Sequence, residues 1–236
     1  MACALSLKPL GERCMSFDNL PVMPLDTSAR PLFARCLARS AAIAERKGAD
    51  VYRRRLLAGL AGRVIEVGAG TGINFRHYPR TVAEVLAVEP EPNLRAMAEA
   101  AAHESPVPVR VVAGTAEALP APDGSIDAGV SAGLLCSVPD AAAALTELAR
   151  VIRPGGELRF YEHVISRRRR AALLQRGLDA SGLWERAMGG CHTSRDTDAA
   201  IAHAGFDVQS IERFTFHPTL LDFHVAPKIL GRARRA

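Results

Sequence analysis

The feature that most constrains this chain is the segment from Gly62 to Gly72, which reads Gly-Arg-Val-Ile-Glu-Val-Gly-Ala-Gly-Thr-Gly. Its apolar and β-branched residues predict a buried strand, and its three alternating glycines predict a turn without side chains. We expect a helix to start directly after the turn, near 71–78. The backbone N–H groups of such a unit can point at a ligand that lies against bare main chain. The segment therefore predicts a ligand-binding strand–turn–helix unit.

The spacing of the glycines separates two classes of ligand. A dinucleotide fingerprint reads Gly-x-Gly-x-x-Gly, whereas this chain reads Glu-x-Gly-x-Gly-x-Gly from Glu66 to Gly72. A carboxylate at the end of the strand would repel a pyrophosphate and would favour a cationic ligand that resembles an amino acid. S-adenosylmethionine (SAM) has this chemistry. Two alternatives stay open, namely glycines that only pack and a nicotinamide-dependent oxidoreductase.

Strand and helix patterns alternate along the chain from Arg63 onward. Such alternation predicts a parallel sheet with helices on both faces and ligands at the carboxyl ends of the strands. We therefore expect an α/β, doubly wound, Rossmann-like fold with a seven-stranded, mostly parallel sheet and an antiparallel last strand. The predicted strands lie near 63–67, 84–88, 108–112, 126–131, 156–163, 206–216 and 228–234. The predicted helices lie near 30–60, 71–78, 92–103, 140–152, 167–187 and 194–204.

The chain is expected to form one domain with a short extension. Residues 1–28 show no clean hydrophobic period and are interpreted as a loose N-terminal extension. The domain spans 29–236, in which residues 29–60 form a lid helix over the ligand. Residues 61–165 form the cofactor-binding core, and residues 166–236 supply acceptor-side helices and the last strands.

Charge and cysteine content limit the setting and the partners. The 236 residues carry a net charge of +5, with arginine clusters at 53–55 and 167–170. These clusters are interpreted as solvated faces, with weak attraction to an anionic membrane surface as the alternative. No run of 18 apolar residues occurs, so no spanning helix is expected. The five cysteines are widely spaced and form no Cys-x-x-Cys motif, so neither a disulfide framework nor a zinc site is expected. This cysteine usage predicts a reducing, cytoplasmic setting.

Three further stretches follow the strands and could hold a nucleoside. Glu89 follows the second strand, and a carboxylate there can accept both ribose hydroxyl protons. The turn at 114–120 can offer backbone N–H groups and a side chain to the rim of an adenine. The small residues around Ser131, at the end of the fourth strand, leave room for a methionine tail.

Together these elements resemble the class I SAM-dependent methyltransferases over roughly residues 63–163. The resemblance implies SAM as the cofactor, with Glu66 holding its amino group and Glu89 its ribose. Thr115 replaces the aspartate that relatives usually carry in the third motif, so the contact to the adenine amino group is expected to differ. The implied cofactor-binding residues are Glu66, Gly68, Ala69, Gly70, Gly72, Asn74, Glu89, Pro90, Thr115, Ala116, Glu117 and Ser131.

Two later stretches of sequence resemble a narrower group within this class. The run Phe-Tyr-Glu-His-Val at 160–164 and the run Cys-His-x-x-Arg-Asp-Thr at 191–197 look like methyltransferase-like proteins that include alkyl-thiol S-methyltransferases. The animal members carry an N-terminal membrane helix, which we do not expect here. The candidate catalytic residues are His163, His192 and Arg195, which could provide a cationic environment for a thiol, with a histidine as optional general base.

The expected reaction is methyl transfer from SAM to a small, fairly apolar acceptor, most simply a thiol, by in-line displacement. A thiol with a pKa near 8.5 needs only a modest cationic environment. Cys136 and Cys191 are interpreted as small core residues, and no metal site is expected. Alternatives are N-, O- or C-methylation of a phospholipid amine, a quinone or another small metabolite, and a non-catalytic SAM-binding module. Nucleic-acid methylation is not expected, because the Asn/Asp-Pro-Pro-aromatic signature is missing after the fourth strand.

Overall fold

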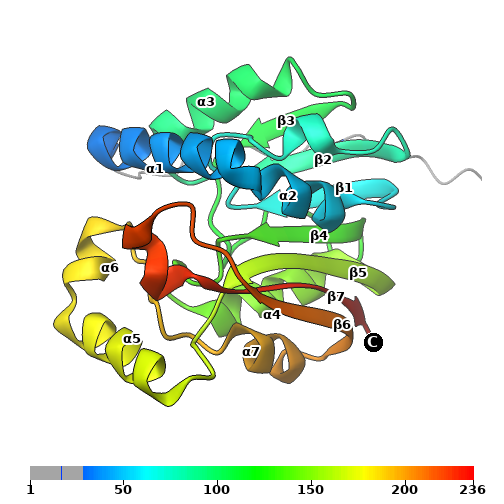
Figure 1. The fold of residues 1–236 in the computed structure, drawn as a ribbon. Helices are drawn as coiled ribbons and strands as arrows, with labels where there is room; N and C mark the ends of the chain where they lie inside the picture. Colours follow the sequence, from blue (N-terminus) through cyan, green and yellow to red (C-terminus); the bar gives the residue numbers. More distant parts are fainter. Residues whose placement is uncertain (1–16, 18–28) are drawn as a thin grey trace, which may run out of the picture.

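A seven-stranded sheet forms the centre of the protein in a computed structural model that describes residue 17 and residues 29–236 (Figure 1). The strand order is β3-β2-β1-β4-β5-β7-β6, and β7 runs antiparallel to both of its neighbours. This confirms the predicted α/β fold. The predicted N-terminal extension lies outside the described residues, except for Phe17. The strands are β1 Gly62–Val67, β2 Val82–Val88, β3 Val109–Val112, β4 Ile126–Ala132, β5 Ile152–His163, β6 Phe206–Thr215 and β7 Pro227–Arg235.

Helices cover both faces of the sheet, because the central strands are apolar on both sides. Val64 packs with α2 and α3 on one face, whereas Ile65, the next residue of β1, packs with α4 and α7 on the other. No helix in the described part of the chain is both long and apolar enough to cross a membrane. The helices are α1 Pro31–Ala44, α2 Asp50–Leu57, α3 Pro92–Ala102, α4 Ala141–Val151, α5 Arg169–Ser181, α6 Leu183–Ala187 and α7 Thr197–His203.

Two helices that were expected to be continuous are interrupted. The segment predicted as one helix over 30–60 contains a π-helical turn, Glu45–Ala49, between α1 and α2. Gly48 has φ +98° there, a left-handed conformation that bends the chain and that only glycine adopts without strain. The segment predicted over 167–187 is likewise divided into α5 and α6 at Gly182. Both interruptions turn the chain over the cavity described below.

The prediction of a helix directly after the glycine turn is wrong. Residues 71–78 contain only a single 3₁₀ turn, η3 Phe75–His77. Gly70 and Gly72 have φ +58° and +73°, which are incompatible with a right-handed helix. Phe75 is fully buried and anchors the segment in the core. The turn therefore has no helix N-terminus behind it, and the N–H groups of Gly68, Ala69 and Gly70 donate to Val88 and Glu89 within the protein.

The ends of α4 follow the sequence at one terminus and depart from it at the other. Asp140 is the N-cap, at the first residue of the predicted helix, and its carboxylate accepts hydrogen bonds from the N–H groups of Ala142 and Ala143 at 2.9 and 3.0 Å. The helix stops at Val151, and β5 begins at once at Ile152, four residues before the predicted start of that strand. The Arg-Pro-Gly-Gly run at 153–156 is therefore the first part of the strand.

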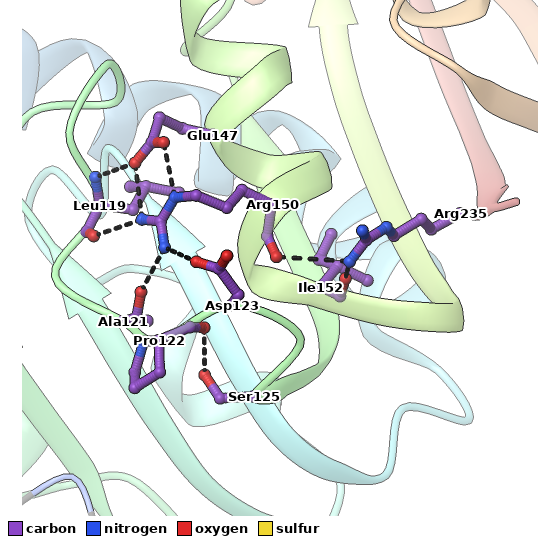
Figure 2. A network of polar contacts seen from close by, with 9 residues as sticks. All are labelled: Leu119, Ala121, Pro122, Asp123, Ser125, Glu147, Arg150, Ile152 and Arg235. Carbon is purple, nitrogen blue, oxygen red and sulfur yellow. Dashed lines mark hydrogen bonds and ion pairs between the residues drawn. The ribbon is translucent and has the colours of Figure 1, made fainter.

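A network of polar contacts around Arg150 fixes the segment that leads into β4 (Figure 2). Arg150 of α4 donates to both carboxylate oxygens of Glu147 at 2.7 and 2.8 Å and to the carbonyl oxygens of Leu119 and Ala121 at 3.0 and 2.9 Å. It also pairs with Asp123 at 2.7 Å. Since residues 119–125 follow the turn at 114–118, the network holds that turn against the sheet.

We expect Arg150→Met to lower the free energy of unfolding by about 1–2 kcal/mol, because two carbonyl oxygens and the Glu147 carboxylate lose their donor. Chemical denaturation followed by circular dichroism measures the change. Arg153→Met is the matched control, since Arg153 forms a more exposed pair with Asp127 and should cost about 0–1 kcal/mol. Equal losses in the two variants would contradict a special role for the network.

Candidate active site

A single cavity of about 910 Å³ lies at the carboxyl ends of the parallel strands. It starts at the glycine turn after β1 and at the ends of β2 and β3, and it continues past the ends of β4 and β5. Helix α1 and the segment that contains α6 supply further walls, on the side where Figure 1 shows both elements next to the strand ends. Pockets for small molecules span about 300–1,000 Å³, so this one lies at the upper end of that range.

The glycine turn exposes main chain to the cavity at Gly68, Ala69 and Gly70. At Gly70 a Cβ atom would meet no other atom within 4 Å, so the space beside its backbone is open. Gly72 differs, because a Cβ atom there would lie 2.7 Å from the ring of Phe75. Gly72 is not among the residues that line the cavity, and it serves the packing of the turn. The expected bare-backbone cradle is therefore present at Gly70.

Glu66 lies beneath this turn in a buried hydrogen-bond network. Its carboxylate accepts hydrogen bonds from Asn74 Nδ2 at 2.8 Å and from the Tyr78 hydroxyl at 2.6 Å. Arg53 of α2 donates to Asn74 Oδ1 at 2.8 Å, which joins α2 to the network. Burial raises the pKa of Glu66, while the two hydrogen bonds oppose the shift. Glu66 and Asn74 both reach the cavity wall, so the structure brings together these two residues that the sequence predicted.

Glu89 connects the turn after β1 with the turn after β2. Its carboxylate accepts from the N–H of Gly70 at 2.8 Å and from the N–H of Glu91 at 3.0 Å. The side chain is 5% exposed and lines the cavity together with Pro90. Burial raises the pKa of Glu89, and the two backbone hydrogen bonds lower it. Two backbone N–H groups thus fix the Glu89 carboxylate at the wall of the cavity, where the sequence placed a group that could accept ribose hydroxyls.

The remaining predicted cofactor residues divide into two groups. Thr115, Ala116 and Glu117 line the cavity from the turn after β3. Ser131 does not line it, because it is fully buried in β4 and donates its hydroxyl to Glu162 at 2.6 Å. Alternate residues of a strand point to opposite faces, and Ala132 is the residue of β4 that reaches the cavity.

The predicted catalytic residues are also divided. His163 and His192 line the cavity, and His192 Nδ1 lies 2.8 Å from the carbonyl oxygen of Gly190. Arg195 points elsewhere, since its guanidinium donates to the carbonyl oxygen of Leu135 at 2.7 Å and lines a separate small pocket. Arg195 therefore fixes the loop after β4 from behind and does not reach the cavity.

Two cysteines join His163 at the far end of the cavity. Cys191 Sγ lies 3.2 Å from His163 Nε2, and one ligand-type atom from each of Cys136, His163 and Cys191 lies within 4.8 Å of the other two. The hydrogen bond between the two thiols lowers the pKa of Cys191, and His163 adds to this effect. The same bond raises the pKa of Cys136. The sequence interpretation treated both cysteines as core residues, because 55 positions separate them and no spacing rule connects them.

A half-buried lysine is a third residue that the sequence did not reveal. Lys228 opens β7 opposite His163 of β5, and it lines the cavity. Its ammonium lies 5.6 Å from the centre of the Tyr161 ring. Burial lowers the pKa of Lys228, while the nearby Cys136 and Glu162 oppose the shift. Nothing in the sequence marks Lys228 as a cavity residue, because the last strand also carries three arginines.

Known proteins resemble this chain in sequence and in fold. A family model described as a methyltransferase domain matches residues 65–160. The thiol S-methyltransferase TMT1B of Mus musculus is 34% identical, covering 89% of this chain and 87% of the relative. TMT1B of Rattus norvegicus is 33% identical, covering 86% and 84%.

Solved structures agree on the fold. A SAM-dependent methyltransferase from Thermotoga maritima superposes with a TM-score of 0.62 at 24% identity, covering 87% of this chain and 98% of its own. The [4+2]-cyclase SpnF superposes with a TM-score of 0.68 at 17% identity, covering 92% and 98%. A cyclase with this fold shows that the fold alone does not fix the reaction.

Sequence, fold and cavity together define a SAM-dependent methyltransferase, with SAM as the methyl donor. The chain belongs to the methyltransferase family that contains the mammalian thiol S-methyltransferases. The open backbone at Gly70 and the buried Glu89 carboxylate fit the cofactor. When bound, SAM supplies an electrophilic methyl group on a sulfonium centre.

We expect Glu89→Gln to weaken SAM binding about ten- to hundredfold, because hydrogen bonds to a charged group contribute about 1.5–3 kcal/mol. Calorimetric titration with SAM measures the change. Glu99→Gln is the matched control, since Glu99 is exposed on α3, and it should bind SAM as the wild-type chain does. Unchanged affinity in Glu89→Gln would contradict the assignment of Glu89 to the cofactor.

Proposed function

We propose that this enzyme transfers the methyl group of SAM to the sulfur of a small, fairly apolar thiol. The observation that carries the proposal is that one cavity extends from Gly70 and Glu89 to His163 and Lys228. A donor at the first end and an acceptor at the second would lie in the same cavity, next to each other, which a direct transfer requires. The mammalian relatives named thiol S-methyltransferases support a thiol as the acceptor.

The cofactor end would be shared among the turns after β1, β2 and β3. We assign the methionine part of SAM to Gly68, Ala69 and Gly70, with Glu66 and Asn74 beneath its amino group. Glu89, followed by Pro90, would accept the ribose hydroxyls. The adenine would lie along Thr115, Ala116 and Glu117, where backbone groups replace the aspartate that is absent from this motif. Gly72 and Ser131 would support these turns from outside the cavity.

The acceptor end is suited to an apolar molecule. Tyr161 of β5 lines it, and its ring stacks parallel to Phe214 of β6, with centres 6.2 Å apart. Tyr52 of α2 stacks on Phe214 at 4.3 Å and lies 6.0 Å from Tyr161. The three rings form one cluster that supports Tyr161 from behind the cavity wall. Further apolar lining comes from Phe33, Leu37, Met188, Phe216 and Val225.

The chemistry of the step asks little of the protein beyond alignment. The thiol loses its proton, and the sulfur lone pair forms the new S–CH₃ bond as the sulfonium C–S bond breaks and its electrons return to the cofactor sulfur. The cationic side chains of the acceptor end would favour the thiolate over the thiol. His163 is the candidate general base, because it lies at the carboxyl end of β5 and faces the cavity. His192 lies on the rim and would contribute to binding.

We expect the enzyme to convert SAM and a short alkanethiol into the methyl thioether and S-adenosylhomocysteine. A panel with labelled SAM should contain the thiol, the alcohol and the amine of one chain length. Only the thiol should be methylated at neutral pH, because the thiolate is a strong nucleophile, the amine is protonated and the alcohol stays un-ionised. Mass spectrometry of the organic layer identifies the atom that carries the label.

The same panel separates the alternatives. Labelling of the amine or of a quinone, with none on any thiol, would contradict the proposal. An arm with anionic phospholipid vesicles tests whether the arginines at 167–170, next to the exposed Leu173 and Leu174, bring the enzyme to a membrane surface. Activity only with vesicles would favour a lipid amine as the acceptor.

We expect Phe33→Ala to raise the KM for an apolar thiol roughly fivefold, with a smaller change in kcat, because about 1 kcal/mol of apolar contact is lost. Phe33 lines the cavity from α1, and its ring packs against Gly189. Steady-state kinetics with a short alkanethiol measure the effect. Leu32→Ala is the matched control, because Leu32 is 81% exposed on the same helix. Equal effects of the two changes would show that α1 does not wall the acceptor.

A further inference from the structure

Three residues with metal-binding side chains converge where the cavity passes the ends of β4 and β5. Cys136 lies in the loop after β4, His163 ends β5, and Cys191 lies in the loop between α6 and α7. Within the described residues, these three form a group whose ligand-type atoms all lie within 4.8 Å of one another. All three residues are buried, and all three line the cavity. The established methyl donor does not explain why two thiols and an imidazole meet here.

His163 supplies an independent sign of a missing partner. Its side chain is 7% exposed, and its Nε2 lies 3.2 Å from Cys191 Sγ. Its other nitrogen, Nδ1, is buried and has no hydrogen-bond partner among the described residues. Buried polar atoms almost always have a partner. A cation bound at Nδ1 would supply the missing partner, whereas one bound at Nε2 would take the place of the contact with Cys191.

The two loops that carry the cysteines are fixed to each other and to the sheet. The N–H of His192 donates to the carbonyl oxygen of Cys136 at 2.8 Å, which places the two loops side by side. Glu162, the neighbour of His163 in β5, accepts hydrogen bonds from the N–H groups of Leu134 and Leu135 at 3.1 and 3.3 Å. These contacts hold the Cys136 loop, so the cluster is built before any ligand arrives.

The loop of Cys191 is fixed from its far side as well. Asp179 of α5 accepts hydrogen bonds from the N–H and hydroxyl groups of Thr193 and Ser194 at 2.6–2.8 Å. Gln175, also in α5, donates to the carbonyl oxygen of Thr193 at 2.8 Å. A site whose ligands are supported by such outer contacts keeps its geometry on binding.

The dimensions of the cluster suit a tetrahedral cation. With metal–sulfur bonds of about 2.3 Å and metal–nitrogen bonds of about 2.0–2.1 Å, tetrahedral ligands lie roughly 3.5–3.8 Å apart. The cluster lies within a few tenths of an ångström of this at the His163–Cys191 contact of 3.2 Å, and below 4.8 Å throughout. Two sulfurs and one imidazole select a soft or borderline cation over Mg²⁺ or Ca²⁺.

We propose that Cys136, His163 and Cys191 bind one divalent cation of the zinc type, with a fourth position open to the cavity. Three protein ligands and one open position are the arrangement of zinc sites that bind a substrate. The open position would take the sulfur of the acceptor, a part of the inference that depends on the thiol reaction proposed above. The sequence expectation of no metal site would then be wrong, because the spacing of the three ligands hides them.

The reaction at such a site balances without a further reactant. The acceptor R–SH binds the cation as R–S⁻ and releases its proton to solvent, so that His163 acts as a metal ligand in place of the general base proposed for the metal-free reaction. The bound sulfur forms the S–CH₃ bond, and the cofactor sulfur recovers the electron pair of the broken C–S bond. The product, a neutral thioether, is a weaker ligand than a thiolate and leaves. Two cysteine thiolates and a third thiolate give the site one net negative charge, which the adjacent Lys228 would offset.

The test loads cobalt, whose spectrum reports its ligands, into the whole chain. The protein is reduced, stripped with a chelator and titrated anaerobically with Co²⁺. We expect one equivalent per chain, with the visible bands of tetrahedral cobalt and a thiolate-to-cobalt charge-transfer band. Zn²⁺ should displace the cobalt at one equivalent. Absence of these bands in the wild-type chain overturns the proposal, as does a Cys136–Cys191 disulfide that forms in air while no metal binds.

Matched variants assign the ligands. Cys136→Ser, Cys191→Ser and His163→Asn should each lose at least tenfold in cobalt affinity, while SAM binding by calorimetry verifies that they fold. Cys36→Ser, an exposed cysteine of α1, and a Cys3→Ser/Cys14→Ser variant should bind cobalt as the wild type does. His103→Asn, at an exposed histidine, is the control for His163. Full binding in a Cys136→Ser/Cys191→Ser variant overturns the proposal.

A last arm separates the metal site from the thiol reaction. Addition of a short alkanethiol to the cobalt protein should strengthen the charge-transfer band, whereas the alcohol of equal length should leave it unchanged. Thiol methylation at full rate by the metal-free chain overturns the role of the cation and leaves the proposed function intact. Cobalt binding at the three residues without methylation of any thiol removes the proposed function and leaves the metal site intact.

Discussion

The carboxylate of Glu89 is the interaction on which the cofactor end of this enzyme depends. It accepts one hydrogen bond from Gly70, after β1, and one from Glu91, after β2. Glu91 in turn caps α3 through the N–H of Leu94 and accepts from the N–H of Arg30 at the start of α1. Two strand ends and two helices are thus positioned through adjacent carboxylates. Their burial makes this order firm, because an unpaired buried carboxylate is costly.

Glu162 plays the corresponding part at the acceptor end. It accepts from Ser131 inside β4 and from the N–H groups of Leu134 and Leu135 in the loop that follows. The loop then carries Cys136 to the end of β5, where His163 lies. Both halves of the cavity are therefore built in one way, with a buried glutamate at the end of a strand gathering the N–H groups of a neighbouring turn. The methyl donor and the acceptor would meet between two such anchored turns.

The parts that could be predicted from the sequence are those set by local pattern. The apolar runs and the glycine spacing predicted all seven strands, and the position of Glu89 after β2 predicted its place at the cavity. The predicted helix at 71–78 failed because the positive φ angles of Gly70 and Gly72 exclude it. Ser131 and Arg195 were misplaced because one residue of register, or one turn of loop, decides which face a side chain reaches.

The cluster at the acceptor end lies beyond that kind of inference. Cys136, His163 and Cys191 come from three elements, and only the sheet order β4-β5-β7 and the fold of the loop after α6 bring them together. Lys228 reaches the same place through the antiparallel pairing of β7 with β5. Contacts between residues far apart in the sequence leave no periodic pattern from which they could be predicted. Their chemistry is visible only after the chain has been folded.

Helix α1 lines the cavity along its length. The N–H of Arg30, at its start, donates to Glu91 next to Glu89, and its Phe33 ring packs against Gly189 at the other end of the cavity. The bend at Gly48 separates α1 from α2, and α2 packs against the sheet. A movement that lifts this helix would open both ends of the cavity at the same time. Under the proposed function, entry of the acceptor and departure of the spent cofactor would then depend on the same movement.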